Sequence, residues 1–218
     1  MPSPTYDQTY YRSRESWPDF RMEAVELVRL AKIRPEARVL EVGCGSGGLL
    51  RRLAVQARLV VGVDLSEEGL RLARVRIPDA SCTLLIRAGA TALPFEAASF
   101  DAVVAQHLLE HLPDPIEGIR EWRRVLRPGG LLALVTPNAL FPDPSLFHDP
   151  THVSIQTPDT LVSTLQAVGF QVAHLSTLFP YLGRGRVGRA LSIRLAPFAR
   201  HLPAFALGGR SLVVAAVV

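Results

Sequence analysis

The glycine-rich stretch from Glu41 to Gly48 is the part of the sequence whose residue types and spacing could do chemistry. It has the sequence EVGCGSGG and follows a short apolar run. Glycines let the backbone turn sharply and let a ligand approach bare main chain. Asp64 follows 21 residues after Gly43, at the end of a second apolar run. A carboxylate at that place can accept hydrogen bonds from both hydroxyls of a ribose.

Two ligand classes need this layout, dinucleotides and S-adenosylmethionine. Gly43, Gly45 and Gly48 satisfy the G-x-G-x-x-G pattern of dinucleotide-binding proteins. Glu41 favours S-adenosylmethionine, because a carboxylate beside the loop repels a pyrophosphate but suits the ammonium group of a methionine moiety. A dinucleotide-dependent oxidoreductase is therefore the weaker alternative.

The elements that must position these residues alternate between short β-branched runs and longer helical stretches. This alternation is typical of a mostly parallel sheet covered by helices. Strands are expected at 38–42, 59–64, 83–88, 100–105, 131–136, 170–175 and 211–218, and helices at 22–31, 49–57, 66–77, 115–126 and 159–168. We expect an α/β fold with a Rossmann-like, doubly wound seven-stranded sheet, mostly parallel with an antiparallel last strand, and helices on both faces. The ligand should lie at the carboxyl ends of the first strands.

The glycine loop and Asp64 belong to a series of four motifs between residues 38 and 138. In chain order these are VLEVGCGSGGLL, VVGVDLS, ATALPFEAASFDAVVAQHLLEHLPDP and EWRRVLRPGGLLALVTPN. Together they resemble class I S-adenosylmethionine-dependent methyltransferases, in particular the small-molecule group that contains the ubiquinone and menaquinone biosynthesis enzymes. A looser similarity extends over 150–175. Dehydrogenases do not share these later motifs. The resemblance implies methyl transfer from S-adenosylmethionine to an oxygen, nitrogen or carbon nucleophile of a small or lipid-like molecule.

The resemblance also implies which residues contact the cofactor: Glu41, Gly43, Cys44, Gly45, Asp64, Leu65, Gly89, Ala90, Gln106 and Tyr11. Glu41 would bind the amino group, Asp64 the ribose, and Leu65 would pack on the adenine. In similar enzymes an acid often precedes the A-x-x-LPF segment and binds the adenine amino group. Gly89 stands there in this chain, so the adenine would depend on the backbone of Gly89 and Ala90.

Histidines supply the candidate catalytic groups, because a hydroxyl or protonated amine acceptor needs a base and histidine titrates near neutral pH. His107 and His111 follow the fourth expected strand, and His148 and His152 lie in FHDPTHVSIQTP after the fifth. We expect His107, His148 and His152 to act as a base or to orient the acceptor. His111 is expected to be structural, and a loop held by an Asp149 cap is the alternative for the later pair.

The segment HLLEH also matches H-x-x-E-H, an inverted zinc-peptidase motif. Here it follows a parallel strand, and the sequence shows no downstream acidic ligand segment. We therefore predict no metal. The two cysteines, Cys44 and Cys82, have no spacing that suggests a metal site or a disulfide.

We expect one domain over 1–218, with a helical lid at 1–34, a cofactor-binding core at 35–138 and a substrate-side segment at 139–218. The composition, 48% apolar and 20% charged, is typical of a globular protein. Without an apolar run long enough to span a bilayer or serve as a secretory signal, we expect a cytoplasmic location. A cofactor-binding protein without catalysis is the alternative function, and the oligomeric state is left open.

The positive charge of the chain is concentrated after Pro180. From there to Val218 the sequence has six arginines and no acid, whereas the rest has 18 basic and 20 acidic residues. In the expected helical insert at about 180–209, Val187, Leu191, Leu195 and Phe198 share one helical face. This predicts either an interfacial helix that contacts an anionic membrane surface or a lipid-linked acceptor, or an ordinary cap over the substrate pocket. Nucleic-acid binding is not expected, because no aromatic residues alternate with the arginines.

Overall fold

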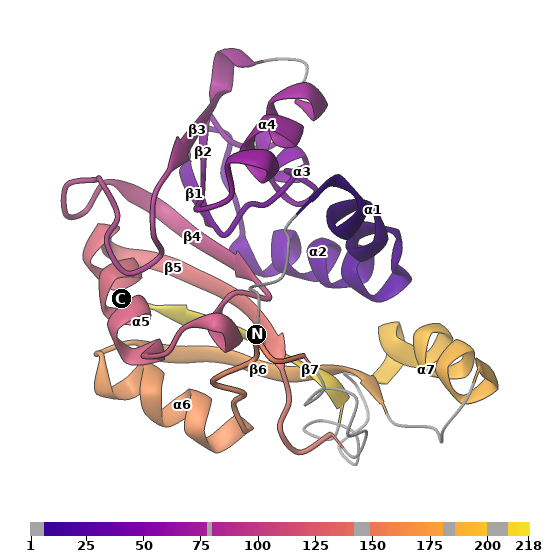
Figure 1. Ribbon diagram of the computed structural model, residues 1–218. Helices are drawn as coiled ribbons and strands as arrows, with labels where there is room; N and C mark the ends of the chain where they lie inside the picture. Colours follow the sequence, from indigo (N-terminus) through magenta and orange to yellow (C-terminus); the bar gives the residue numbers. More distant parts are fainter. Residues whose placement is uncertain (1–6, 78–79, 142–148, 181–185, 200–208) are drawn as a thin grey trace.

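The computed structural model describes residues 7–77, 80–141, 149–180, 186–199 and 209–218 (Figure 1). Its centre is a seven-stranded sheet in the order β3-β2-β1-β4-β5-β7-β6. The strands are β1 Arg38–Val42, β2 Leu59–Asp64, β3 Thr83–Arg87, β4 Phe100–Gln106, β5 Leu126–Pro137, β6 Gln171–Pro180 and β7 Gly209–Val217. Strands β1 to β5 pair in parallel, and β7 is antiparallel to both of its neighbours. The expected Rossmann-like doubly wound sheet is confirmed.

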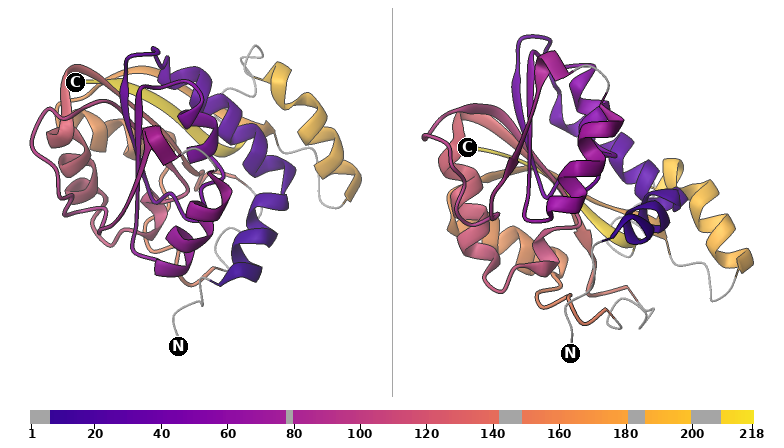
Figure 2. Two further views of the ribbon diagram at one scale, coloured as in Figure 1. Left: turned by 90° about the horizontal axis from the view of Figure 1, so that it is seen from above. Right: turned by 45° about the horizontal axis from the view of Figure 1, so that its top comes forward.

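Helices cover both faces of the sheet (Figure 2). They are α1 Gln8–Ser16, α2 Pro18–Ala31, α3 Leu50–Ala54, α4 Glu67–Arg76, α5 Pro115–Val125, α6 Pro158–Ala167 and α7 Arg186–Ala199, with 3-10 turns η1 Ala80–Cys82 and η2 Leu109–His111. Residues of α2, α3 and α4 form the core on one face, and residues of α5 and α6 form it on the other. The two clusters are separated by the alternating side chains of the strands.

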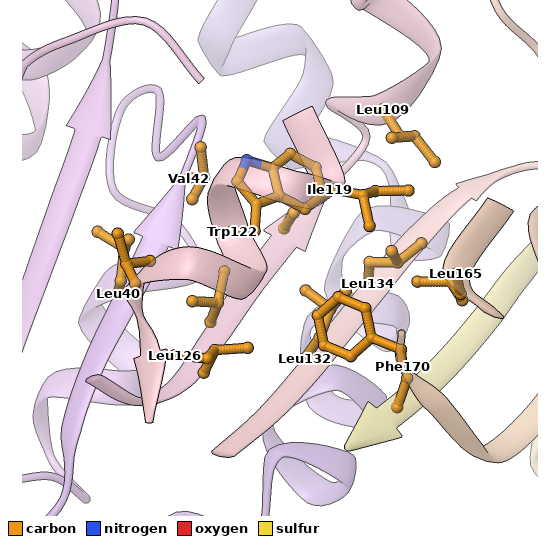
Figure 3. Close-up of a cluster of buried hydrophobic side chains, with 14 of the residues drawn as sticks. Leu40, Val42, Leu109, Ile119, Trp122, Leu126, Leu132, Leu134, Leu165 and Phe170 are labelled. Atoms are coloured by element: carbon orange, nitrogen blue, oxygen red, sulfur yellow. The ribbon is translucent and has the colours of Figure 1, made fainter. Parts of the chain in front are cut away.

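Helix α5 shows how the sequence places one of these layers. Gly118, Ile119, Trp122 and Val125 are its buried residues, at the three- and four-residue spacing of one helical face. Trp122 is fully buried and lies among apolar side chains of β1, β4 and β5 (Figure 3). Burial of an aliphatic or aromatic side chain of this size contributes about 1.5–3 kcal/mol, so a few such contacts are enough to hold the helix on the sheet.

Several boundaries differ from those expected. Strand β6 continues to Pro180, beyond the expected end at residue 175. Helix α2 begins at Pro18, since proline is well suited to the first helical position, and a separate helix α1 precedes it. Helix α3 has only five residues. The expected turn at Arg127–Gly130 lies inside β5, because Gly129 N donates to Val218 O and Gly130 O accepts from Val218 N, which keeps this segment in the sheet.

The strand order reverses between β1 and β4, since the chain moves outward to β3 on one side and to β5 on the other. The carboxyl ends of β1, β2 and β4 therefore meet at the switch point, which is where open α/β sheets bind ligands. These ends carry Val42, Asp64 and Gln106. In the described part of the chain, no helix is long and apolar enough to cross a membrane. The three-part division of the domain and the cytoplasmic location stay predictions.

Candidate cofactor and acceptor site

A cavity of about 560 Å³ opens at this switch point. Most of the residues selected from the sequence line it: Tyr11, Glu41, Gly43, Cys44, Gly45, Asp64, Leu65, Ala90, Gln106 and His107. Gly89 lies next to the lining residues Ala88 and Ala90. The structure therefore brings together residues that are far apart in the sequence, as expected for a single ligand site.

Glu41 and Asp64 supply two carboxylates at the floor of the cavity. Glu41 is only 3% exposed, and its Oε2 atom has no hydrogen-bond partner among the residues that the structure describes. Burial, together with the charges of Asp64 and Glu15, raises the pKa of Glu41 well above its usual value. Burial also raises the pKa of Asp64, although its oxygens accept hydrogen bonds from the backbone N–H of Ser66 and Gly45, at 2.8 and 2.7 Å. Such a pair suits a ligand that brings a cation and hydroxyl donors.

The glycine loop leaves little room for side chains. Gly43 and Gly45 have φ values of 74° and 48°, in the left-handed region that favours glycine. A Cβ atom on Gly45 would lie 2.9 Å from Cε1 of Tyr11, and one on Gly43 would lie 3.0 Å from Cδ1 of Leu108. Cys44, between them, is buried, and burial raises the pKa of its thiol well above the usual value. The Cys44 thiol is thus uncharged and packs within the loop, and it does not act as a nucleophile.

Helix α1 lies directly against the glycine loop. Its Glu15 accepts hydrogen bonds from the Ser46 hydroxyl and from Arg76 of α4, and Arg76 also donates to Ser46 Oγ at 3.1 Å. The Tyr11 ring packs over Gly45 and is 8% exposed. Side chains of α1 therefore connect the N-terminal segment to the loop and to the helix that follows Asp64.

Gln106 and His107 form the other end of the cavity. The Gln106 amide nitrogen donates to Phe20 O at 2.9 Å and to Glu23 Oε2 at 3.3 Å, while its buried oxygen Oε1 has no partner. His107 follows β4 with φ of 52°. Its Nε2 lies 2.7 Å from Glu23 Oε2, and its Nδ1 lies 3.0 Å from Glu110 Oε1.

The two carboxylates determine the protonation of His107. Burial opposes the charged imidazolium, but the charge of Glu23 and the hydrogen bonds to both glutamates raise the pKa of His107. In turn, burial alone would raise the pKa of Glu110, but the hydrogen bond and charge of His107 lower it to about 2. A doubly bonded imidazolium has no free lone pair, so this arrangement suits an orienting group better than a base.

The other histidines lie around this end of the cavity. His111 lines it, and its Nδ1 lies 3.1 Å from Thr151 O, which agrees with the structural role expected for it. His152 packs against His111 with ring centroids 5.0 Å apart, and lines a small adjoining cavity of about 40 Å³ that His107 also borders. His148 lies outside the described residues.

Glu110, His111 and His152 place ligand atoms within 4.8 Å of one another, a spacing that could hold a metal ion. Both Glu110 oxygens, however, already accept hydrogen bonds, one shared with His107 Nδ1 and one from the Thr136 hydroxyl. The observed contacts satisfy this carboxylate without an ion, and the absence of a metal stays our prediction.

The selection from the sequence missed Arg14, Glu15 and Glu23, all of which belong to α1 or α2. A signal for the last of these was present: Asp19, Glu23 and Glu26 share one face of α2 and are all buried. Asp19 pairs with Arg210 at 2.7 Å, and Glu23 also accepts a hydrogen bond from Ser211. Acids at i, i+4 and i+7 within an amphipathic helix point to buried polar partners, because unpaired buried carboxylates are very costly.

The sheet order, the glycine loop and the acid after β2 define a Rossmann-like α/β fold with its ligand site at the switch point. Residues 40–134 match the family model described as "Methyltransferase domain". The matched residues run from β1 into β5 and include the glycine loop and Asp64.

Two curated relatives illustrate the similarity. The protein named "Probable S-adenosylmethionine-dependent methyltransferase" of Mycobacterium tuberculosis (strain H37Rv) is 36% identical over 162 residues, which cover 73% of this chain and 58% of the relative. A ubiquinone biosynthesis O-methyltransferase of Xanthomonas campestris pv. campestris is 39% identical over 106 residues, which cover 48% of this chain and 44% of the relative. The chain thus spans about half the length of these relatives.

Solved structures agree in fold at low sequence identity. An S-adenosylmethionine-dependent methyltransferase from Mesorhizobium loti superposes with a TM-score of 0.72 at 21% identity, covering 93% of this chain and all of that one (100%). The [4+2]-cyclase SpnF has a TM-score of 0.68 at 20% identity, covering 90% of this chain and 80% of its own. The second match shows that this fold is not restricted to one kind of reaction.

Proposed function

We propose that the protein transfers the methyl group of S-adenosylmethionine to an oxygen, nitrogen or carbon nucleophile of a small or lipid-like molecule. One observation carries the proposal: two buried oxygens without hydrogen-bond partners, Glu41 Oε2 and Gln106 Oε1, belong to residues that line the same cavity. Buried acceptors without partners are rare and destabilising, unless a ligand supplies the donor or positive charge. S-adenosylmethionine supplies an ammonium and a sulfonium group.

Each end of the cavity then has a defined task. Glu41 would bind the ammonium group, and Asp64 would accept hydrogen bonds from the ribose hydroxyls. Leu65, which is 67% exposed although it lines the cavity, would pack on the adenine and lose contact with water. Tyr11 would cover the methionine half from the side of α1.

When bound, the cofactor supplies a methyl group on a positively charged sulfur, which is already an activated electrophile. The protein has to hold the acceptor in line with that methyl group and keep water out. Such orientation can lower a barrier by roughly 7–11 kcal/mol in ideal cases. Gln106 would face the methyl group. His107 would contact the acceptor through its ring and not remove a proton from it, since both of its ring nitrogens are hydrogen-bonded to carboxylates. His148 and His152 stay candidates for a base.

Two alternatives differ in their consequences. A cofactor-binding protein without catalysis would keep every contact above, and the likeness to a [4+2]-cyclase is consistent with chemistry other than methyl transfer. A dinucleotide enzyme is disfavoured, because a pyrophosphate at the loop would face Glu41 and Asp64, and because α3 has only five residues to provide a helix dipole.

Calorimetric titration with S-adenosylmethionine, S-adenosylhomocysteine and NAD tests the proposal. We expect micromolar binding of the first two, at least about tenfold weaker binding in Asp64→Ala through loss of charged hydrogen bonds, and no NAD binding. Asp159→Ala is the matched control, because Asp159 is exposed in the first turn of α6, away from the cavity. A folded wild type that binds NAD, or binds neither sulfur compound, would refute the cofactor assignment.

Turnover separates catalysis from binding alone. Protein that binds S-adenosylmethionine is incubated with candidate acceptors extracted from cells, and S-adenosylhomocysteine is measured. Formation that depends on an acceptor supports methyl transfer, whereas tight binding without turnover over a broad acceptor set favours the non-catalytic alternative.

A further inference from the structure

Helix α7 presents apolar side chains to solvent. Val187, Leu191 and Leu195 are 82%, 47% and 41% exposed. Their four-residue spacing places them along one stripe of the helix. The helix packs on the protein through the opposite side, where Ser192 is 7% exposed and Ile193 packs against the core cluster of the α2 face.

The orientation of α7 distinguishes the two interpretations of the insert, a helix that contacts a membrane surface and a cap over the substrate pocket. A cap over the substrate pocket would turn its apolar stripe inward. None of the α7 side chains that the structure describes lines the 560 Å³ cavity or the smaller cavity beside His152. In each view α7 lies at the outside of the molecule, near the end of the sheet that carries β6 (Figures 1 and 2).

The charge around the stripe is of one sign. Arg194 is exposed and lies next to Leu191 and Leu195 on the helix surface. The sequence from 180 to 209 has five arginines and no acidic residue, whereas the chain before it has 18 basic and 20 acidic residues. An exposed apolar helix face within a stretch that is rich in arginine and free of acidic residues has the composition of helices that lie in the interface of an anionic membrane.

We propose that α7 binds the surface of an anionic lipid bilayer, with Val187, Leu191 and Leu195 inserted at the level of the headgroups and Arg194 near lipid phosphates. A second copy of the chain is a poorer occupant. Pairing this stripe with itself would bring together the arginine-rich, acid-free stretches of two copies. A single short helix binds reversibly, so the contact would concentrate the protein at the membrane without fixing it there.

Vesicle flotation of the full chain tests this proposal, using phosphatidylcholine vesicles and vesicles of phosphatidylcholine and phosphatidylglycerol at 3:1. We expect binding to the anionic vesicles, at least about fivefold less binding to neutral ones, and loss of binding as salt screens the arginines. Leu191→Ser/Leu195→Ser should reduce partitioning into anionic vesicles by about tenfold or more, because two apolar side chains that would insert into the bilayer are replaced by polar ones. Arg194→Glu should also weaken binding to anionic vesicles.

Two matched controls keep the result specific. Val55→Ser/Val75→Ser changes side chains that are 81% and 77% exposed elsewhere on the molecule, and Arg74→Glu changes an exposed arginine of α4. Both should bind vesicles like the wild type. Circular dichroism and thermal unfolding verify the fold of every variant, so the lipid results do not depend on the methyltransferase proposal.

Three outcomes would overturn it: no flotation of the wild type, equal loss in both double variants, or a wild-type dimer by light scattering that Leu191→Ser/Leu195→Ser dissociates without any vesicle binding.

Discussion

Gly89 is the residue through which we expect the affinity of the proposed cofactor site to be set. A Cβ atom there would meet only Leu65 Cδ2, at 3.9 Å, so a larger side chain has room. The neighbouring carbonyl of Ala90 already accepts a hydrogen bond from Trp122 Nε1 at 3.0 Å. If the adenine lies at Gly89 as proposed, neither Gly89 nor Ala90 offers a side-chain acceptor to its amino group, whereas the enzymes that the chain resembles often have an acid there.

We predict that Gly89→Asp binds S-adenosylhomocysteine more tightly than the wild type. One added hydrogen bond contributes about 1 kcal/mol, which corresponds to about fivefold in the dissociation constant. Calorimetry measures the change, and Gly89→Ala, which adds the Cβ without the acceptor, should leave the affinity unchanged. Weaker binding in both variants would show that space and not a missing hydrogen bond decides the choice of glycine.

Glu41 predicts a pH dependence of stability. Because burial beside Asp64 and Glu15 raises its pKa in the folded state, the folded protein holds this proton more tightly than the unfolded chain. Ionisation of Glu41 therefore destabilises the ligand-free protein as the pH rises above about 4.5, the usual value. Below that pH both states are protonated and the effect disappears.

Glu41→Gln should consequently unfold at a higher temperature than the wild type at pH 7 and at the same temperature near pH 4. A gain of about 1 kcal/mol raises Tm by about 2–4 °C in a protein of this size. The same variant should bind S-adenosylmethionine at least about tenfold more weakly, because it lacks the charge that pairs with the ammonium group. A variant less stable than the wild type at pH 7 would contradict the assignment.

At the scale of elements, the buried acids on one face of α2, Asp19, Glu23 and Glu26, include residues that hydrogen-bond the N-terminal helices to the sheet. Glu23 accepts hydrogen bonds from His107 at the end of β4 and from Ser211 of β7. This contact positions α2 across two strands that are distant in the sequence. It also keeps His107, which borders both cavities, in a backbone conformation with positive φ.

Glu23→Gln should lower the free energy of unfolding by about 3 kcal/mol, as expected when one partner of a buried ion pair is removed. The folded-state pKa of His107 is raised, so its contribution is complete below about 6.5 and is lost as the pH rises through the raised value. The pKa of Glu23 is lowered, so its contribution is present above about 4.5 and is lost in acid.

The difference in stability between the variant and the wild type should therefore be largest between about pH 4.5 and 6.5 and smaller in alkali. Denaturant titrations across this range measure it. Glu36→Gln, which removes an exposed partner of Arg34, should change stability by less than about 1 kcal/mol. A difference that is the same at every pH would show that the loss comes from packing alone.

The sequence predicts the strands and helices better than it predicts the contacts within the candidate site. The strands and the residues at their carboxyl ends follow from apolar periodicity and from glycine spacing, which are local properties. The pairing of Glu23 with His107 joins positions 84 apart in the chain, so no local pattern contains it. The continuation of β5 through Gly129 was missed for the same reason, since it depends on hydrogen bonds to Val218.

At the scale of the whole molecule, the cofactor should stabilise the fold, because the residues proposed to bind it come from α1, β1, β2 and β4 together. If the proposed site is correct, S-adenosylhomocysteine at 100 times its dissociation constant adds about 2.7 kcal/mol, or about 5–10 °C in Tm. Differential scanning fluorimetry measures this shift. Asp64→Ala at the same ligand concentration should show almost none, whereas Asp159→Ala should match the wild type.

The position of β7 has a consequence for synthesis of the protein on the ribosome. This strand follows β6 in the chain but lies between β5 and β6 in the sheet, and within the described residues β7 is the strand with which β6 pairs. A nascent chain that has not yet reached Gly209 leaves the edge of β5 open and β6 unpaired, and open strand edges attract other chains. Completion of this sheet is therefore delayed until residues 209–217 have emerged, which makes stalled or truncated chains candidates for aggregation and for chaperone binding.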